Sequence, residues 1–156
     1  MSTGPVAAVI SKPLVNKPDM SLDLALVLLA GVREQCSTRG IALAAAVVDR
    51  GGNLVSSARM DGAQLGALSI ATDKAFTAAA FGHPTSAWTA SSAPGGGDWG
   101  LAHALGGRAI VFPGGVPIFD GGELIGALGV SGAASTVDEE CALAAAAAAG
   151  VEAAAA

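Results

Sequence analysis

Hydrophobic positions along the chain follow two periods, that of an α-helix and that of a β-strand. The helical period is clearest over residues 22–38, where apolar residues cover most of the circumference. Ser21 precedes this segment and Arg39 and Gly40 follow it; serine is a favoured N-cap and glycine a favoured helix terminator. The pattern therefore predicts a helix over residues 22–38, with one side on a sheet and another side against a partner subunit.

Two pairs of apolar runs are each joined by a short turn that contains two consecutive glycines. The runs are residues 41–48 and 54–59 around the turn 49–53, and residues 116–119 and 124–130 around the turn 120–123. Runs of this length around a glycine-containing turn are typical of β-hairpins. The sequence thus predicts two hairpins, and we attribute the similarity of their turns to common hairpin chemistry.

The segment between the hairpins combines a helix with irregular chain. Residues 64–81 have apolar positions at helical spacing and predict a second long helix, which Gly82 and Pro84 end. The remainder of the segment predicts a helical turn at residues 86–90, a loop at 91–100, a short helix at 101–105 and a strand at 108–112.

A third long helix is predicted near the end of the chain. Ser135 and Thr136, followed by Asp138 and Glu139, resemble a capping box in front of an alanine-rich run. We expect this helix to reach about Gly150.

These elements define the expected architecture. Five strands joined mainly by hairpins, with helices from both ends of the chain, predict an antiparallel sheet in a layered α+β domain. We assign residues 21–156 to this single domain. Residues 1–20 contain three prolines and no clear period, and we interpret them as an irregular arm with a short strand at 7–10.

Composition narrows the class of protein. The chain has 156 residues, of which 52% are apolar but only 4% aromatic, and many of the apolar residues are alanine. Such a core needs close approach of its elements, and a subunit interface would add buried area. A net charge of −5, with the basic residues scattered singly, makes nucleic-acid binding improbable. No apolar run is long enough to span a bilayer, so we expect a soluble, cytoplasmic protein without membrane contact.

The sequence offers no metal-site or disulfide pattern. Cys36 and Cys141 are far apart and lack a Cys-x-x-Cys spacing, so we interpret both as small buried residues. The two histidines have no acidic pair or thiolates near them in the sequence, which disfavours a zinc site.

Several short motifs occur in the order of a known family. They are residues 47–55, 59–62, Ser69, 74–75, 77–78, 114–117, 126–132 and 138–139. Over residues 21–150 the chain therefore resembles the GlcG/HbpS-like haem-binding family, which includes the C-terminal domain of PduO-type proteins. The resemblance implies a profilin-like, three-layer α/β/α fold with a five-stranded antiparallel sheet. It also implies homo-oligomers, often tetramers to octamers. Several members bind haem, the family has been labelled haem-degrading, and others have no settled activity.

His83 and His103 are the candidate haem ligands. His83 lies at a predicted helix end beside Pro84, where it would serve as an axial ligand or as a general acid–base. The structural alternative is a histidine that only caps the last helix carbonyls. His103, in a short helix after a glycine-rich loop, has the same two interpretations, and the sequence does not decide between the two histidines.

Lys74, Arg59 and Asp61 are the candidate charged contacts. Lys74 lies in a nearly charge-free helix and matches the family's Lys-Ala-x-Thr-Ala pattern, which favours contact with a carboxylate or a haem propionate. Alternatively, Lys74 extends to solvent or pairs with Asp61 or Asp73. Arg59 is a candidate carboxylate clamp, and Asp61 a candidate ligand contact. The structural alternative for this pair is a salt bridge or an N-cap.

Glycines and one tryptophan complete the candidate site. Gly114 and Gly115 would let backbone N–H groups approach an anion, as would residues 95–97, although neither stretch has a P-loop context. The alternative is a tight turn and a flexible loop. Trp99 follows the glycine run and is expected to find an apolar partner, either a pocket or a neighbouring subunit.

Three functions are compatible with these residues. The first is a homo-oligomeric small-ligand-binding protein that binds haem or another tetrapyrrole, as the resemblance implies. The second is a cofactor-free isomerase, lyase or hydrolase in which Arg59 or Lys74 holds a small carboxylated or carbonyl metabolite and His83 moves a proton. The third is an assembly or accessory protein. The first two share one prediction, that Arg59, Lys74 and His83 converge on a single hollow.

Overall fold

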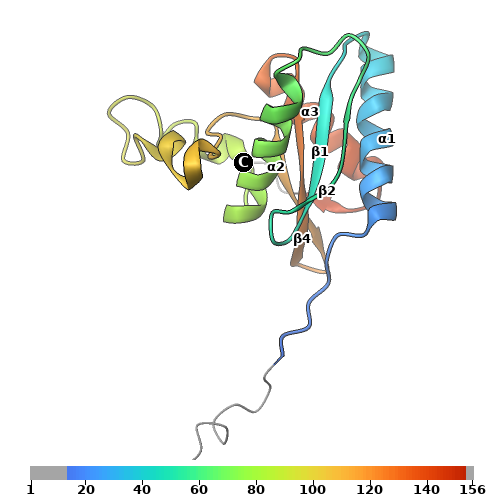
Figure 1. Ribbon diagram of the computed structural model, residues 1–156, viewed down its shortest axis with the longest axis horizontal. Coiled ribbons are helices and arrows are strands. Elements are labelled where there is room, and N and C mark those ends of the chain that lie inside the picture. Colours follow the sequence, from blue (N-terminus) through green and yellow to red (C-terminus); the bar gives the residue numbers. More distant parts are fainter. Residues whose placement is uncertain (1–13, 154–156) are drawn as a thin grey trace, which may run out of the picture.

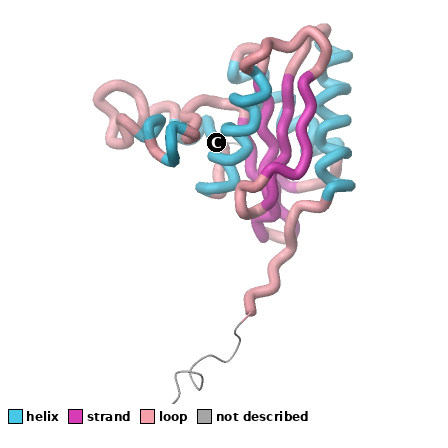
Figure 2. Tube along the Cα trace, viewed as in Figure 1, coloured by secondary structure: helices cyan, strands magenta, loops and turns pink. Residues whose placement is uncertain are grey.

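The computed structural model describes residues 14–153 and arranges them in three layers (Figure 1, Figure 2). The elements are α1 (Leu22–Arg39), β1 (Ala44–Asp49), β2 (Leu54–Arg59), α2 (Ala67–Phe81), β3 (Gly115–Asp120), β4 (Glu123–Ser131), α3 (Ser135–Ala148) and β5 (Glu152–Ala153). Short 3-10 helices are η2 (Thr85–Trp88), η3 (Leu101–His103) and η4 (Leu105–Gly107). The strands form one antiparallel sheet in the order β2-β1-β4-β3-β5. The α+β prediction with a five-stranded antiparallel sheet is confirmed.

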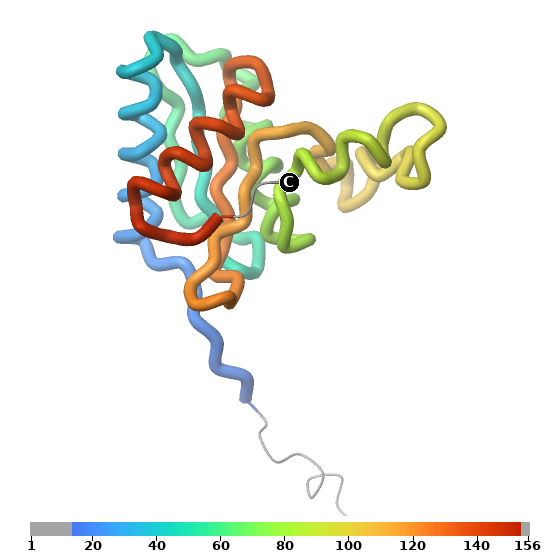
Figure 3. The backbone as a smooth tube through the Cα atoms, turned by 180° about the vertical axis from the view of Figure 1, so that it is seen from behind, coloured from blue at the N-terminus to red at the C-terminus, as the bar shows by residue number. Residues whose placement is uncertain are grey.

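The two faces of the sheet pack against different helices. Along β1, Ala45 and Val47 belong to the large core that also contains side chains of α1 and α3. The alternate residues Ala44, Ala46 and Val48 pack instead with alanines of α2. This division follows from the two-residue period of a strand. Helices α1 and α3 therefore cover one face and α2 the other, as the view from behind also shows (Figure 3).

Helix α2 lies unusually close to the sheet. A Cβ at Gly129 would overlap the carbonyl oxygen of Ala71 and lie 2.6 Å from the backbone nitrogen of Ala75. A Cβ at Gly115 would overlap the carbonyl of Lys74 in the same way. This face is built from glycine and alanine because larger side chains would push the helix away.

Local signals of the first helix and the first hairpin have the expected roles. The Ser21 hydroxyl accepts a hydrogen bond from the Leu24 backbone N–H at 3.1 Å, and Gly40 ends α1 with a φ of 66°. In the turn between β1 and β2, one carboxylate oxygen of Asp49 accepts hydrogen bonds from the N–H groups of Gly51 and Asn53, both at 2.9 Å. The predicted helix and hairpin are confirmed.

The strand predicted at residues 108–112 is wrong, and the fifth strand lies elsewhere. The Thr77 hydroxyl donates to the Arg108 carbonyl at 3.1 Å and accepts from the Ile110 N–H at 3.0 Å, so a side chain of α2 satisfies backbone groups that a strand would pair. The sheet gains β5 instead, whose Ala153 pairs with Ile118 of β3.

Two helix starts also differ from the prediction. Helix α2 begins at Ala67 rather than at residue 64, after Gly66, which makes no side-chain cap. The capping box predicted for α3 does not form, because Ala134 is the N-cap and makes no side-chain hydrogen bond. Asp138 is drawn into the interior, where one carboxylate oxygen accepts from the Ala133 N–H at 2.9 Å. The short strand predicted at 7–10 lies outside the described residues.

Residues 89–107 form an excursion that projects from the side of the layered body (Figure 1, Figure 3). Its backbone is held mainly by short-range turns, such as the hydrogen bond from the Gly96 N–H to the Ala93 carbonyl at 2.8 Å. Within residues 14–153, no helix combines the length and hydropathy needed to cross a membrane.

The close approach of α2 predicts a strong effect of one methyl group. Gly129→Ala should lower the free energy of unfolding by about 1–3 kcal/mol, the usual cost of overpacking, because the obstructing atoms are backbone. Gly66→Ala is the matched control, since a Cβ there meets nothing within 4 Å. Urea unfolding of both variants checks this, and equal stabilities would contradict the packing of α2.

Candidate functional site

Lys74 lies inside the protein rather than in an open hollow. Its side chain is 1% exposed, and its Nζ donates to Asp138 Oδ2 at 2.9 Å and to the Val130 carbonyl at 2.9 Å. The predicted alternatives, solvent exposure and a pair with Asp61 or Asp73, are wrong. The ammonium group also lies 5.2 Å from the ring centroid of Phe112, a cation–π distance. In this arrangement Lys74 contacts protein atoms and joins α2 to the start of α3.

Gly114 and Gly115 make room for this lysine. A Cβ at Gly114 would overlap Lys74 Nζ and lie 2.6 Å from the Val130 carbonyl oxygen, and Gly114 has a φ of 129°. The N–H of Gly115 donates to the Thr85 hydroxyl at 3.0 Å. Both glycines are buried, so they allow close packing here.

Burial and pairing have opposite effects on Lys74. Burial lowers the pKa of its ammonium group from the ordinary value of 10.5, and the hydrogen bond and charge of Asp138 act against this. Asp138 is itself 2% exposed, with one oxygen bound to Lys74 and the other to the Ala133 N–H. The two charges satisfy each other, so removal of either one would leave a buried charge alone.

His83 lies at the end of α2 in a cluster of aromatic rings. Its imidazole centroid is 4.8 Å from the Trp88 ring and 6.1 Å from the Phe81 ring. Its Nδ1 lies 3.1 Å from the carbonyl oxygen of Pro84, and the side chain is half-buried. Trp88 Nε1 is buried and has no hydrogen-bond partner within residues 14–153. The cluster therefore combines an oriented imidazole with a buried donor that lacks an acceptor.

Arg59 and Asp61 lie in a groove between α1 and the end of β2. The groove has a volume of about 810 Å³ and is lined by Leu29, Ala30, Arg33, Cys36, Ser37, Gly40, Ile41, Ala42, Ala58, Arg59, Met60 and Asp61. We call it the α1–β2 groove. Arg59 donates from Nη1 to the Ala63 carbonyl at 3.1 Å. Sequence reasoning missed Arg33, since an arginine on an exposed helix surface looks like any solvated charge.

The predicted shared hollow of Arg59, Lys74 and His83 does not form. Arg59 ends β2, the edge strand, whereas Lys74 bonds to β4 and lies against the glycines that lead into β3, on the other side of β1. His83 belongs to a third place, the aromatic cluster after α2. The close approach of α2 accounts for the separation, because it directs Lys74 into the interior.

Trp99 and His103 lie on the excursion. The indole of Trp99 is 66% exposed and His103 is also exposed. The apolar partner predicted for Trp99 is not supplied by residues 14–153 of the same chain. A second hollow, of about 360 Å³, lies beside β2 and α2 and includes Ser69 and Asp73 in its lining.

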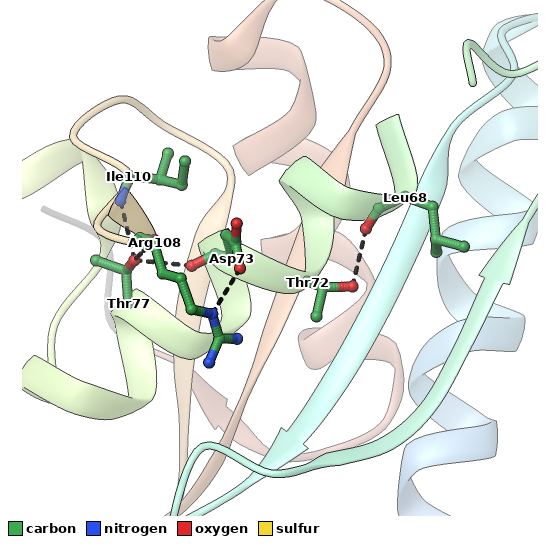
Figure 4. A network of polar contacts seen from close by, with 6 residues as sticks. All are labelled: Leu68, Thr72, Asp73, Thr77, Arg108 and Ile110. Atoms are coloured by element: carbon green, nitrogen blue, oxygen red, sulfur yellow. Dashed lines mark hydrogen bonds and ion pairs between the residues drawn. The ribbon is translucent and has the colours of Figure 1, made fainter. Parts of the chain in front are cut away.

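A polar network fixes the chain just after the excursion to α2 (Figure 4). Arg108 Nε donates to Asp73 Oδ1 at 2.9 Å, and the guanidinium lies 3.8 Å from the centroid of the Phe76 ring. Thr77 bridges to the backbone of Arg108 and Ile110 beside them. No group of three or more His, Cys, Asp or Glu side chains is placed to hold a metal ion in the described part of the chain.

The buried pair predicts a measurable pH dependence. Asp138→Asn should cost about 3–5 kcal/mol of unfolding free energy at neutral pH, because it leaves the Lys74 charge buried and alone. The variant should lower the pKa of folded Lys74 further. Below 10.5 the unfolded lysine then holds its proton while the folded one releases it, so stability should rise with pH more steeply than in the wild type.

Chemical denaturation between pH 7 and 10 measures this effect. Lys74→Met combined with Asp138→Asn serves as the control, because removal of both charges should restore most of the stability. If Asp138→Asn alone were as stable as the wild type and had the same pH dependence, the buried ion pair would be contradicted.

Comparison with known proteins gives consistent results. Residues 20–147 match the family model described as haem degrading protein HbpS-like. A Citrobacter freundii protein, described as an uncharacterized 15.0 kDa protein in the dhaT-dhaS intergenic region, is 38% identical over 94 residues. That match covers 60% of this chain and 65% of the relative, so slightly less than two thirds of the relative is spanned.

Several solved structures share the fold of this chain at 30–31% sequence identity. The Klebsiella pneumoniae protein ORFY superposes with a TM-score of 0.87 at 30% identity, over 89% of this chain and 96% of its own. The complex of PduOC with heme gives 0.82 at 30% identity, over 86% and 97%. A double mutant of Streptomyces reticuli HbpS gives 0.79 at 31% identity, over 94% and 97%. With its three layers, its short motifs and a family match over most of its length, the chain belongs to the HbpS-like family.

Proposed function

We propose that this protein binds haem, with His83 as the iron ligand. The PduOC relative has been crystallised with heme, and it superposes on most of this chain. The observation in this chain that carries the proposal is the orientation of His83 by the Pro84 carbonyl, at 3.1 Å from Nδ1. Histidines that bind metals usually donate their other ring N–H to such an acceptor, which leaves Nε2 free for the metal.

The surroundings of His83 fit a porphyrin. Phe81 and Trp88 place apolar ring surfaces next to the imidazole and contact each other edge-on, with their ring centroids 5.1 Å apart. The buried N–H of Trp88 lacks an acceptor within the described residues, and a propionate carboxylate would supply one. When bound, haem supplies iron chemistry; the contribution of this chain is to orient the ligand and to exclude water from one side.

We further propose that the protein works as a homo-oligomer, of four to eight subunits as the family resemblance implies. Neither the α1–β2 groove nor the hollow beside β2 and α2 includes His83, so a neighbouring subunit would be needed to enclose a haem there. Large apolar side chains are available for such contacts: Leu22, Leu26 and Val27 on α1 and Trp99 on the excursion are 49–66% exposed.

The enzyme alternative has less support. It requires Arg59 or Lys74 beside His83 at one substrate, and the three residues lie in three separate places. A cytoplasmic location stays a prediction; Cys36 and Cys141 are both free thiols, as is usual in a reducing compartment.

Haemin titration tests the ligand assignment. Wild-type protein should shift the Soret band of haemin to a saturating endpoint. His83→Ala should weaken binding by about tenfold or more and alter the bound spectrum, because the residue that would hold the iron is lost. His103→Ala, which removes the other histidine, is the matched control and should bind as the wild type does. An unchanged titration with His83→Ala would exclude the proposed ligand.

Light scattering after size exclusion tests the oligomer. Wild-type protein should elute as a species of four to eight subunits. Leu26→Glu combined with Val27→Glu, which places two charges on the exposed side of α1, should shift the mass toward the monomer of 15.0 kDa. A monomeric wild type would contradict self-association, and an unchanged mass in the variant would exclude α1 as the interface.

A further inference from the structure

The α1–β2 groove is larger than the hollow beside β2 and α2, and the haem proposal does not use it. Its volume of about 810 Å³ falls in the range of small-molecule sites. One wall is a helix surface and the other is the end of an edge strand with the loop after it. The lining contains both apolar residues and arginines, and this combination indicates which class of ligand the groove would bind.

Apolar atoms make up much of the lining. They come from α1, from the segment that enters β1 and from the end of β2: Leu29, Ala30, Ile41, Ala42, Ala58 and Met60. Such a surface favours a ligand with an apolar body, because its burial releases water from both partners.

Two arginines, Arg33 and Arg59, line the same groove. Within residues 14–153, four basic side chains have a carboxylate within 4.0 Å: Lys17, Arg39, Lys74 and Arg108. The basic residues of this range without such a partner are Arg33, Arg50 and Arg59, and two of these three line the groove. The chain has a net charge of −5, so two arginines without a carboxylate partner in one groove stand out from the rest of the chain.

We propose that the α1–β2 groove binds an organic monocarboxylate with an apolar body, held by Arg33 and Arg59. A guanidinium presents parallel N–H donors that match the two oxygens of a carboxylate. Arg59 keeps one Nη1 contact to the Ala63 carbonyl, which positions its head at the groove. Asp61 adds one negative charge to the lining, and it disfavours ligands that carry several negative charges. This site is separate from His83 and does not depend on haem binding.

Pyrenebutyrate and pyrenebutanol test this proposal as a pair of probes. They share a fluorescent apolar body and differ in the carboxylate. Wild-type protein should bind the acid at least about tenfold more tightly than the alcohol, as measured by fluorescence anisotropy. In amide NMR spectra the acid should perturb residues of the groove, such as Gly40, Ile41 and Ala58.

Three arginine variants locate the contact. Arg33→Gln is the primary variant, because the guanidinium of Arg33 makes no hydrogen bond within the described residues. This variant should lower the affinity for pyrenebutyrate by about tenfold. Arg59→Gln should do the same. Arg50→Gln is the matched control, since it removes the same charge from an arginine outside the groove and should leave the affinity within about twofold. None of these variants should change the affinity for the alcohol.

Four results with the pyrene probes alone would overturn the proposal. They are no binding of pyrenebutyrate, equal affinities for the acid and the alcohol, an equal loss with Arg50→Gln, or amide shifts confined to residues outside the groove. Haemin separates this site from the proposed haem site: Arg33→Gln should leave the haemin titration unchanged. Competition between haemin and pyrenebutyrate would instead place haem in the groove, and the separate carboxylate site would then be excluded.

Discussion

Helix α2 packs so closely against β3 and β4 that only small residues fit between them, and this packing determines where Lys74 lies. Glycine at 115 and 129, together with the alanines of α2, removes the side chains that would separate helix from sheet. At this distance the side chain of Lys74 is confined to the interior, where it needs an anion. Asp138, at the start of α3, supplies one and thereby connects the helices of both layers across the end of the sheet.

Because Lys74 is buried, the other residues that could bind a ligand lie at the surface of the domain. Because Lys74 is paired with Asp138, the remaining candidate ligand-binding residues lie at two surfaces, the aromatic cluster of His83 and the α1–β2 groove. Within residues 14–153, the first has an oriented imidazole and a tryptophan donor without an acceptor, and the second has two arginines without carboxylate partners. The two proposed ligand sites therefore lie at different surfaces of one domain.

The sequence could predict elements that depend on neighbouring residues, but it could not predict contacts between residues far apart in the chain. Helix α1 and the first hairpin follow from neighbouring residues, such as the Ser21 cap and the Asp49 turn. The pair of Lys74 and Asp138 joins residues 64 positions apart, and no local pattern indicates it. Residues 108–112 have the composition of a strand, yet the Thr77 hydroxyl bonds their backbone. The groove arginines come from two elements that only the tertiary fold brings together.

An NMR titration of the lysine side chains shows whether Lys74 is confined to the interior. We expect a Lys74 ammonium whose protons exchange slowly with water and whose pKa lies below 10.5, because its side chain is 1% exposed and burial outweighs its pairing with Asp138. Rapid exchange together with a pKa at or above 10.5 would contradict this expectation. Lys74 would then be a solvent-accessible cation, and the packing of α2 that organises this protein would be wrong.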